Sequence, residues 1–226
     1  MQGIHLSFVL LSSQSSGSND LMRPAISALF SKKSIREIAF IPAQSDKARV
    51  YFDMVKEYYR SVGIEASLYF DIDEEYDPRK QAALFQMPAI HLSGGSTYHF
   101  LENLQRRSLR SLLREYVLKG GIIIGVSAGA IIMTPRIDSS KLCGDPIIPG
   151  LDTTALSLCK FEFVPHFNGS AEEKRIIAEY SRTVRSEVYA CSEGSGIIFG
   201  SIGQEIIGMV EVCRNGDWIK VGHAAA

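Results

Sequence analysis

The sequence predicts an α/β protein in which helices cover both faces of a mostly parallel sheet, with antiparallel strands at one edge. Two observations indicate this class. Short apolar runs rich in β-branched residues alternate with amphipathic stretches of helical period through the first half of the chain. In the second half, apolar runs separated by Gly-rich turns are typical of antiparallel hairpins. No linker or repeat divides the 226 residues, so we expect a single domain over 1–226.

The apolar runs define the expected elements. Strands are expected at 4–11, 37–41, 66–70, 88–92, 121–125, 161–164, 188–191, 196–199 and 206–212. Helices are expected at 24–30, 47–60, 97–119 (with a break near Arg107) and 171–185. In the second helix the spacing places Val50, Met54, Val55 and Tyr58 on one face. Ligands of such sheets bind outside the carboxyl ends of the strands, where we therefore look for a site.

Composition excludes several classes of function. The 24 Lys and Arg residues nearly balance 25 Asp and Glu residues, so no basic surface for nucleic acid or anionic membrane is expected. The chain has no apolar run near the roughly 18 residues of a membrane span, and its apolar start lacks a basic leader. The four cysteines are widely spaced, which indicates neither a zinc site nor a disulfide framework. A reducing cytoplasm is the expected compartment.

A candidate nucleophile follows the strand at 121–125. The turn Gly125-Val126-Ser127-Ala128-Gly129 joins this buried strand to a helical stretch. Such a turn is tight and strained, so it needs small residues on both sides of the serine. It places the Ser127 hydroxyl at the carboxyl edge of the sheet, beside the free amide of Ala128. The alternative interpretation is a tight turn without chemistry.

A second Gly-rich turn lies upstream, at Ser93-Gly94-Gly95-Ser96-Thr97, and it also follows a strand and precedes a helix. The amide of Gly95 is the expected second donor to an oxyanion. The turn can equally be a helix entry with Ser96 or Thr97 as N-cap, and both interpretations can hold at once.

A serine nucleophile needs a base and an orienting carboxylate. Of five histidines, His166 lies where a strand ends in Pro-His, so we expect it on the same rim of the sheet as Ser127. Taken alone, such a histidine is more often structural. Glu193 lies just past another strand, in a Gly turn, and its alternative interpretation is a solvated hairpin residue. The competing carboxylates are Asp138, Asp145 and Asp152, after the serine helix.

Five segments together resemble the dipeptidase E and cyanophycinase family of serine peptidases. They are IAFIPAQSD (38–46), SGGSTYHFL (93–101), GVSAGA (125–130), FVPHF (163–167) and EGS (193–195). The resemblance covers nearly the whole chain in the expected order. It implies a flavodoxin-like three-layer sandwich related to class I glutamine amidotransferases. It also implies a triad of Ser127, His166 and Glu193.

The resemblance implies substrate-binding residues less directly. Asp138 or Asp145 is the candidate for binding the substrate amino terminus. Ser96 stands where relatives commonly carry Asn. The arginine that binds an aspartyl side chain in dipeptidase E has no clear counterpart here. Arg175 and Arg182 lie on the helix after His166, and Arg175 is the candidate.

The predicted function is hydrolysis of short peptides through an acyl-enzyme, with Asp-Xaa dipeptides as one substrate class. No metal or cofactor is expected, and neither nucleic acid nor membrane is an expected partner. The chain is expected to be a monomer or a homodimer. Two alternatives stay open. One keeps the triad but acts as an esterase or a cyanophycinase-like isopeptidase. The other is a catalytically silent binding or sensor domain on the same fold.

Overall fold

A computed structural model describes residues 6–14, 20–200 and 203–219. Its larger sheet has seven strands in the order β3-β2-β4-β5-β1-β8-β9. The strands are β1 (Ser7–Leu11), β2 (Glu37–Ile41), β3 (Glu65–Tyr69), β4 (Ala89–Leu92), β5 (Ile122–Val126), β8 (Gly196–Gly200) and β9 (Gly203–Ile207). The first five are parallel, whereas β8 pairs antiparallel with β1, and β9 with β8. The predicted fold class is confirmed.

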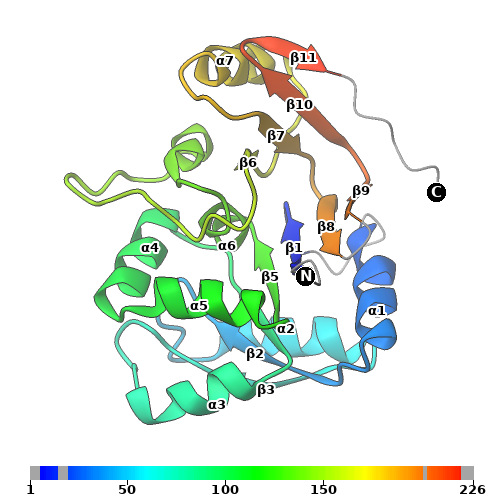
Figure 1. The fold of residues 1–226 in the computed structure, drawn as a ribbon, viewed down its shortest axis with the longest axis vertical. Helices are drawn as coiled ribbons and strands as arrows, with labels where there is room; N and C mark the ends of the chain where they lie inside the picture. Colours follow the sequence, from blue (N-terminus) through cyan, green and yellow to red (C-terminus); the bar gives the residue numbers. More distant parts are fainter. Residues whose placement is uncertain (1–5, 15–19, 201–202, 220–226) are drawn as a thin grey trace, which may run out of the picture.

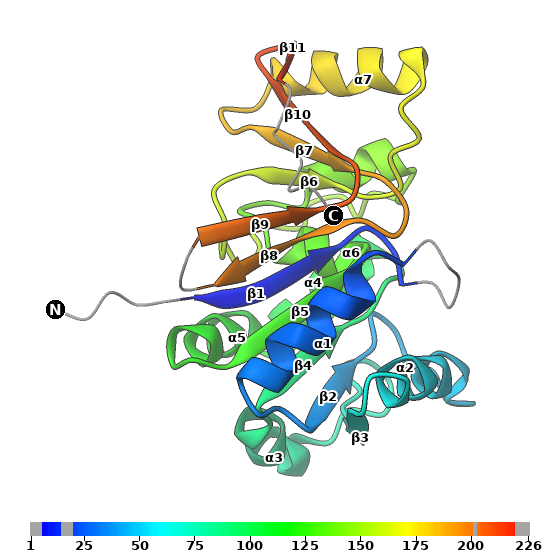
Figure 2. The same ribbon diagram turned by 90° about the vertical axis from the view of Figure 1, so that its right-hand side faces the viewer.

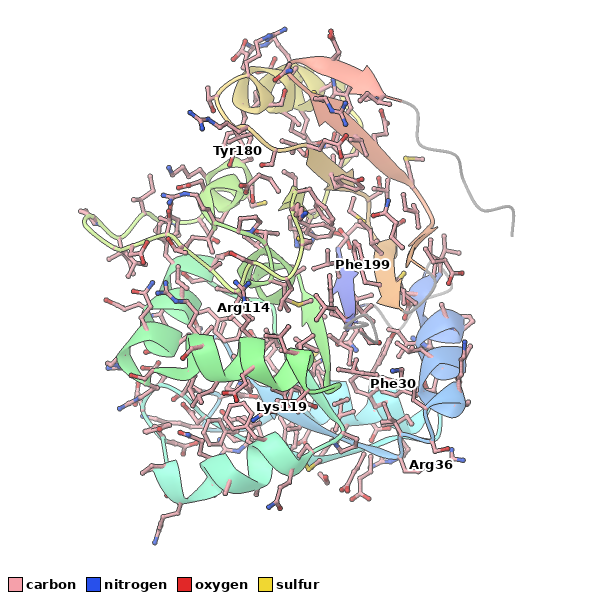
Figure 3. All side chains as sticks on the ribbon, viewed as in Figure 1. Phe30, Arg36, Arg114, Lys119, Tyr180 and Phe199 are labelled. Atoms are coloured by element: carbon pink, nitrogen blue, oxygen red, sulfur yellow. The ribbon has the colours of Figure 1, made fainter. Side chains whose placement is uncertain are left out.

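Helices cover both faces of this sheet. One face carries α1 (Met22–Lys32) and α2 (Val50–Arg60), which bury aromatic and aliphatic side chains against it. The other face carries α3 (Gln81–Gln86), α4 (Thr97–Arg106), α5 (Leu109–Leu118) and α6 (Ala128–Ile132). Figure 1 shows α1 and α5 on opposite sides of β1 and β5. The buried ring of Phe30 points from α1 toward the sheet (Figure 3).

A second, four-stranded sheet lies beside the first, in the order β11-β10-β7-β6. Its elements are β6 (Glu162–Val164), β7 (Val188–Cys191), β10 (Val210–Arg214) and β11 (Asp217–Ile219), with α7 (Ala171–Ser181) packed on it. In Figures 1 and 2 this unit lies above the larger sheet. Phe161, just before β6, stacks on Phe199 of β8 with ring centroids 5.8 Å apart, so the sheets share one core (Figure 3).

The last strands differ from the prediction. The expected strand at 206–212 is two strands, β9 and β10, which belong to different sheets. Gly208 separates them with φ of +78°, and a Cβ there would lie 2.3 Å from Ser195 Oγ. Likewise β7, expected at the edge of one sheet, belongs to the smaller sheet. A chain that turns at Gly208 can leave one sheet and enter the other, and hydrophobic period does not register such a turn.

Helical details also differ. Val50 and Met54 of α2 are exposed, whereas Val55 and Tyr58 are buried, so the four residues do not share a buried face. The predicted helix break is confirmed, because α4 and α5 are separated at Arg107 and Ser108. The structure adds α3 and two 3₁₀ helices at Pro78–Lys80 and Asp138–Cys143. Among the helices of the described ranges, none is both long and apolar enough to cross a bilayer.

Candidate active site

Ser127 lies between β5 and α6 in a backbone conformation that side chains rarely adopt, with φ of +50° and ψ of −108°. The flanking glycines permit this turn. A Cβ on Gly125 would lie 2.4 Å from the carbonyl oxygen of Gly129, and one on Gly129 would lie 2.3 Å from the carbonyl oxygen of Leu92. The serine therefore projects from a strand-to-helix turn that has no room for larger neighbours.

His166 lies opposite this serine. Its Nε2 is 2.8 Å from Ser127 Oγ. The residue follows β6 and also has a positive φ, of 61°. Its backbone N–H donates to the hydroxyl of Ser12, 2.8 Å away, and that hydroxyl donates to the carbonyl oxygen of Cys191, also at 2.8 Å. The imidazole is thus positioned by contacts to the ends of β1 and β7.

Glu193 completes the relay, because its Oε1 lies 2.5 Å from His166 Nδ1. Partial burial acts to raise the pKa of this carboxyl, but hydrogen bonds from Ser13 and His166 outweigh it and hold the pKa below its ordinary value. The carboxylate is therefore ionised at neutral pH and accepts a hydrogen bond from the Nδ1–H of His166. In that tautomer Nε2 is unprotonated and can accept a proton from Ser127.

The Gly-rich turn after β4 packs directly against Ser127. A Cβ on Gly94 would lie 3.6 Å from Ser127 Cβ. The turn is held by Ser93, whose hydroxyl accepts from the amide of Ala43 at 2.8 Å and whose carbonyl accepts from the amide of Gly129 at 3.0 Å. The Gly-rich turn and the turn that carries Ser127 thus lie next to each other at the carboxyl edge of the sheet, and both offer backbone amides there.

The sequence profile of peptidase family S51 matches residues 8–206, nearly the whole of this arrangement. The chain belongs to peptidase family S51. It is therefore a serine-type peptidase.

Relatives of the S51 chain carry consistent names. An uncharacterized peptidase from Listeria monocytogenes is 28% identical over 76% of this chain and 85% of that protein. A peptidase E from Shewanella amazonensis is 31% identical over 66% of this chain and 63% of that protein. A peptidase E from Nostoc is 28% identical over 65% of this chain and 62% of its own. The matches thus span less than two thirds of both peptidase E proteins.

Two solved structures show the same fold. A crystal structure described as a candidate peptidase E from Listeria monocytogenes superimposes with a TM-score of 0.70 at 24% identity, covering 93% of this chain and 98% of that one. A peptidase from an acI-B1 Actinobacterium gives a TM-score of 0.73 at 16% identity, covering 99% and 97%.

The four predicted substrate-binding residues of the peptidase have different surroundings. Asp145 accepts a hydrogen bond from the amide of Thr97 at 3.1 Å, so it lies at the start of α4, next to the Gly-rich turn. Ser96 is the N-cap of that helix, as one interpretation expected, and accepts from the amide of His99 at 3.4 Å. Both residues thus lie at the N-terminus of α4, which directly follows the Gly-rich turn beside Ser127.

The other two are engaged elsewhere. Asp138 pairs with Arg136 at 2.6 Å and Lys141 at 3.3 Å. Arg175 pairs with Glu172 and Glu179 along the exposed side of α7, at 2.8 and 2.6 Å. No contact of either with the triad occurs in the part of the chain that the structure describes. Their substrate-binding roles stay predictions.

The other two histidines of the described residues, His91 and His99, have partners outside the triad. His91 is buried, with Nδ1 3.0 Å from the hydroxyl of Tyr59, and His99 Nε2 is 3.0 Å from Asp73. His5 and His223 lie outside the described residues. The competing carboxylate Asp152 pairs with Arg110, at 3.1 Å.

Sequence reasoning missed Ser12 and Ser13. The stretch after the first strand is loop-like in composition, and nothing in its pattern marks these serines as part of a site. Ser12 binds the backbone of His166, and the hydroxyl of Ser13 accepts from the amide of Gly194 at 3.0 Å. Their position at the carboxyl end of β1, beside β5, is the signal that could have identified them.

Proposed function

We propose that this S51 peptidase hydrolyses short peptides through an acyl-enzyme formed on Ser127, with His166 as base and Glu193 as orienting carboxylate. The observation that supports this most is the continuous relay from Glu193 through His166 to Ser127, with steps of 2.5 and 2.8 Å. The carboxylate of Glu193, whose pKa is held below its ordinary value, supports the role of orienting group for the imidazole.

Acylation follows from this relay. Ser127 Oγ attacks the carbonyl carbon of the scissile bond while its proton passes to His166 Nε2. Glu193 stabilises the imidazolium that results. His166 then gives the proton to the leaving amine, and the peptide C–N bond breaks. Water takes the place of the amine and loses a proton to His166, which releases the acid and restores the serine.

The negative oxygen of the tetrahedral intermediate needs fixed donors. The amides of Ala128 and Gly95 suit this role, because Ala128 follows Ser127 in its own turn and Gly95 belongs to the Gly-rich turn that packs against it. Asp145, at the end of the Gly-rich turn, is the carboxylate best placed to bind a substrate amino group. A site that binds a free amino terminus next to the nucleophile favours dipeptides and other very short peptides. Preference for Asp-Xaa dipeptides stays a prediction, because Arg175 is paired along its own helix.

An esterase or isopeptidase reaction would use the same relay, so substrate panels have to separate these reactions. The test begins with a fluorophosphonate probe, read by intact mass, on the wild type and Ser127→Ala. We expect one adduct on the wild type and none on the variant. Dipeptides, isopeptides and ester analogues are then compared by kcat/KM, and we expect dipeptides to be the best substrates.

Two results would contradict the proposal. A folded wild type that neither takes the probe nor turns over any panel member would favour a silent binding domain. Turnover that survives in Ser127→Ala would exclude this serine as nucleophile.

A further inference from the structure

A pocket of about 670 Å³ opens beside the nucleophile, within the range of roughly 300–1,000 Å³ that is usual for small-molecule sites. Gly94, Gly95 and Val126 form its end nearest Ser127. Because Gly94 packs against Ser127 and Val126 precedes it, a substrate bound at Ser127 has direct access to this pocket.

His166 does not line this pocket, whose wall comes mostly from elements on one side of the serine. In the larger sheet β4 and β2 flank β5 on one side, and β1 and β8 on the other. The turn after β4, the segment after β2 and α2 form most of the wall, and Gln14 and Arg23, which follow β1, complete it. His166 is anchored to the end of β1 through Ser12. The leaving amine must receive its proton from His166, so it lies on the β1 side. The residue that stays on Ser127 therefore lies toward the pocket.

The wall of the pocket is mainly apolar. Phe40, Val55 and Val126 form its buried part. His91 also lines it, and burial lowers the pKa of this imidazole to about 3, so that the ring is uncharged at neutral pH. At the rim, Tyr51 and Met54 of α2 expose 65% and 63% of their surface. Two such large side chains at a pocket mouth are typical of a binding surface for apolar groups.

The charged residues of the wall do not favour an acidic ligand. Arg23 pairs with Asp20 at 3.3 Å. The carboxylate of Asp46 accepts from the amides that begin α2, at 2.8 to 3.0 Å. Glu57 lies next to Arg60 on α2 and forms an ion pair with it. Arg23, the cation among the described residues that line the pocket, is thus already paired with Asp20. A substrate aspartate would have to compete with Asp20 for this arginine.

We infer that this pocket binds a large apolar side chain, aliphatic or aromatic, of the substrate residue that becomes acylated to Ser127. The inference rests on the proposed peptidase function and specifies its substrate class. Peptides that begin with Leu, Met or Phe are preferred over those that begin with Asp. Met54 is a specificity-determining residue at the mouth.

The experiment compares kcat/KM for Phe-Ala, Leu-Ala, Asp-Ala and Lys-Ala in the wild type, Met54→Lys and Met54→Glu. Met54 is largely exposed, so neither charge is buried and both variants are expected to fold. In the wild type, Phe-Ala and Leu-Ala should exceed Asp-Ala by about tenfold or more. Met54→Lys should lower the ratio of kcat/KM for Phe-Ala to that for Asp-Ala by about fivefold. Met54→Glu should lower the ratio of kcat/KM for Phe-Ala to that for Lys-Ala.

Val50→Lys is the matched control. Val50 is exposed on the same helix but does not line the pocket, so the ratios should stay within about twofold of the wild type. Equal shifts in Val50→Lys and Met54→Lys would overturn the assignment of Met54 to the pocket mouth.

Further outcomes separate the inference from the proposed function. If Ser127 takes the probe and dipeptides are cleaved with an Asp-first preference that Met54→Lys leaves unchanged, the inference fails and the function stands. If apolar selectivity appears at the second residue in Ala-Xaa peptides instead, the acyl-side assignment is wrong. If Ser127 is inert toward probe and peptides alike, both fail.

Discussion

The hydroxyl of Ser12 binds the backbone of His166, although 154 residues separate them in the sequence. Ser12 is fully buried at the carboxyl end of β1. It accepts from the His166 N–H and donates to the carbonyl of Cys191, so one side chain joins the larger sheet to the segments that carry the base and the acid. Ser12 touches no reacting atom and is therefore a positioning residue.

Ser12→Ala should lower kcat by about tenfold with little change in KM, because the imidazole loses the contact that fixes its backbone. The unfolding free energy should fall by about 1–3 kcal/mol, since a buried N–H loses its acceptor. Ser181→Ala is the matched control: this serine is also buried and hydrogen-bonded, but it lies on α7. It should lose comparable stability in urea titrations and keep its kcat. Equal loss of kcat in both variants would mean that Ser12 acts only through stability.

Glu193→Gln should reduce kcat by about 10²- to 10⁴-fold, because the amide keeps the shape of the side chain but not the charge that stabilises the imidazolium. Steady-state kinetics and fluorophosphonate labelling rates measure this loss. Glu172→Gln, which removes an exposed carboxylate on α7, should leave both rates unchanged. Wild-type rates in Glu193→Gln would exclude Glu193 from the triad.

Glu162 should make stability depend on pH. Burial, reinforced by the nearby charge of Asp138, raises its pKa from 4.5 to about 7. Between these two values the folded state holds the proton and the unfolded state does not, so the unfolding free energy falls as pH rises, by up to about 1.4 kcal/mol per pH unit. Glu162→Gln cannot ionise and should remove this fall in urea titrations at pH 5, 6, 7 and 8. An unchanged slope in the variant would assign the dependence to other groups.

Gly129→Ala should destabilise the fold by about 2 kcal/mol or more, because its Cβ would collide with the carbonyl oxygen of Leu92. Gly200→Ala tests whether glycine loss itself matters, since no described residue lies within 4 Å of a Cβ there and its φ is not in the left-handed region. It should change the melting temperature by only a few degrees. Equal melting temperatures for the two variants would contradict the close packing of the serine turn on β4.

The strands of the larger sheet could be predicted because they are short, apolar and separated by polar or Gly-rich turns. The serine turn could be predicted for a similar reason, since a buried strand, a strained serine and small neighbours are adjacent in sequence. The carboxyl-edge rule then pointed to His166, whereas the family resemblance selected Glu193 among several candidate carboxylates. Candidate site residues could thus be predicted where a local sequence pattern marks the end of a strand.

The smaller sheet and the pocket could not be predicted in this way. Hydrophobic period indicates that a run is a strand, but not which sheet it joins, so β9 and β10 were expected as one strand. For α2, the periodic assignment treats Met54 like any apolar residue of a core face. Met54 is exposed because of where α2 lies in the fold. The helix forms one wall of the pocket, so only some of its apolar side chains are buried in the core.

Ser127 follows a strand of the larger sheet, whereas His166 and Glu193 follow strands of the smaller one. While the chain is being synthesised, Ser127 emerges long before its partners, and it is an ordinary alcohol until residue 193 has been added and the two sheets have docked. A nascent chain of this peptidase therefore cannot attack its neighbours on the ribosome. Docking of the two sheets is therefore the folding step that assembles the relay of Ser127, His166 and Glu193.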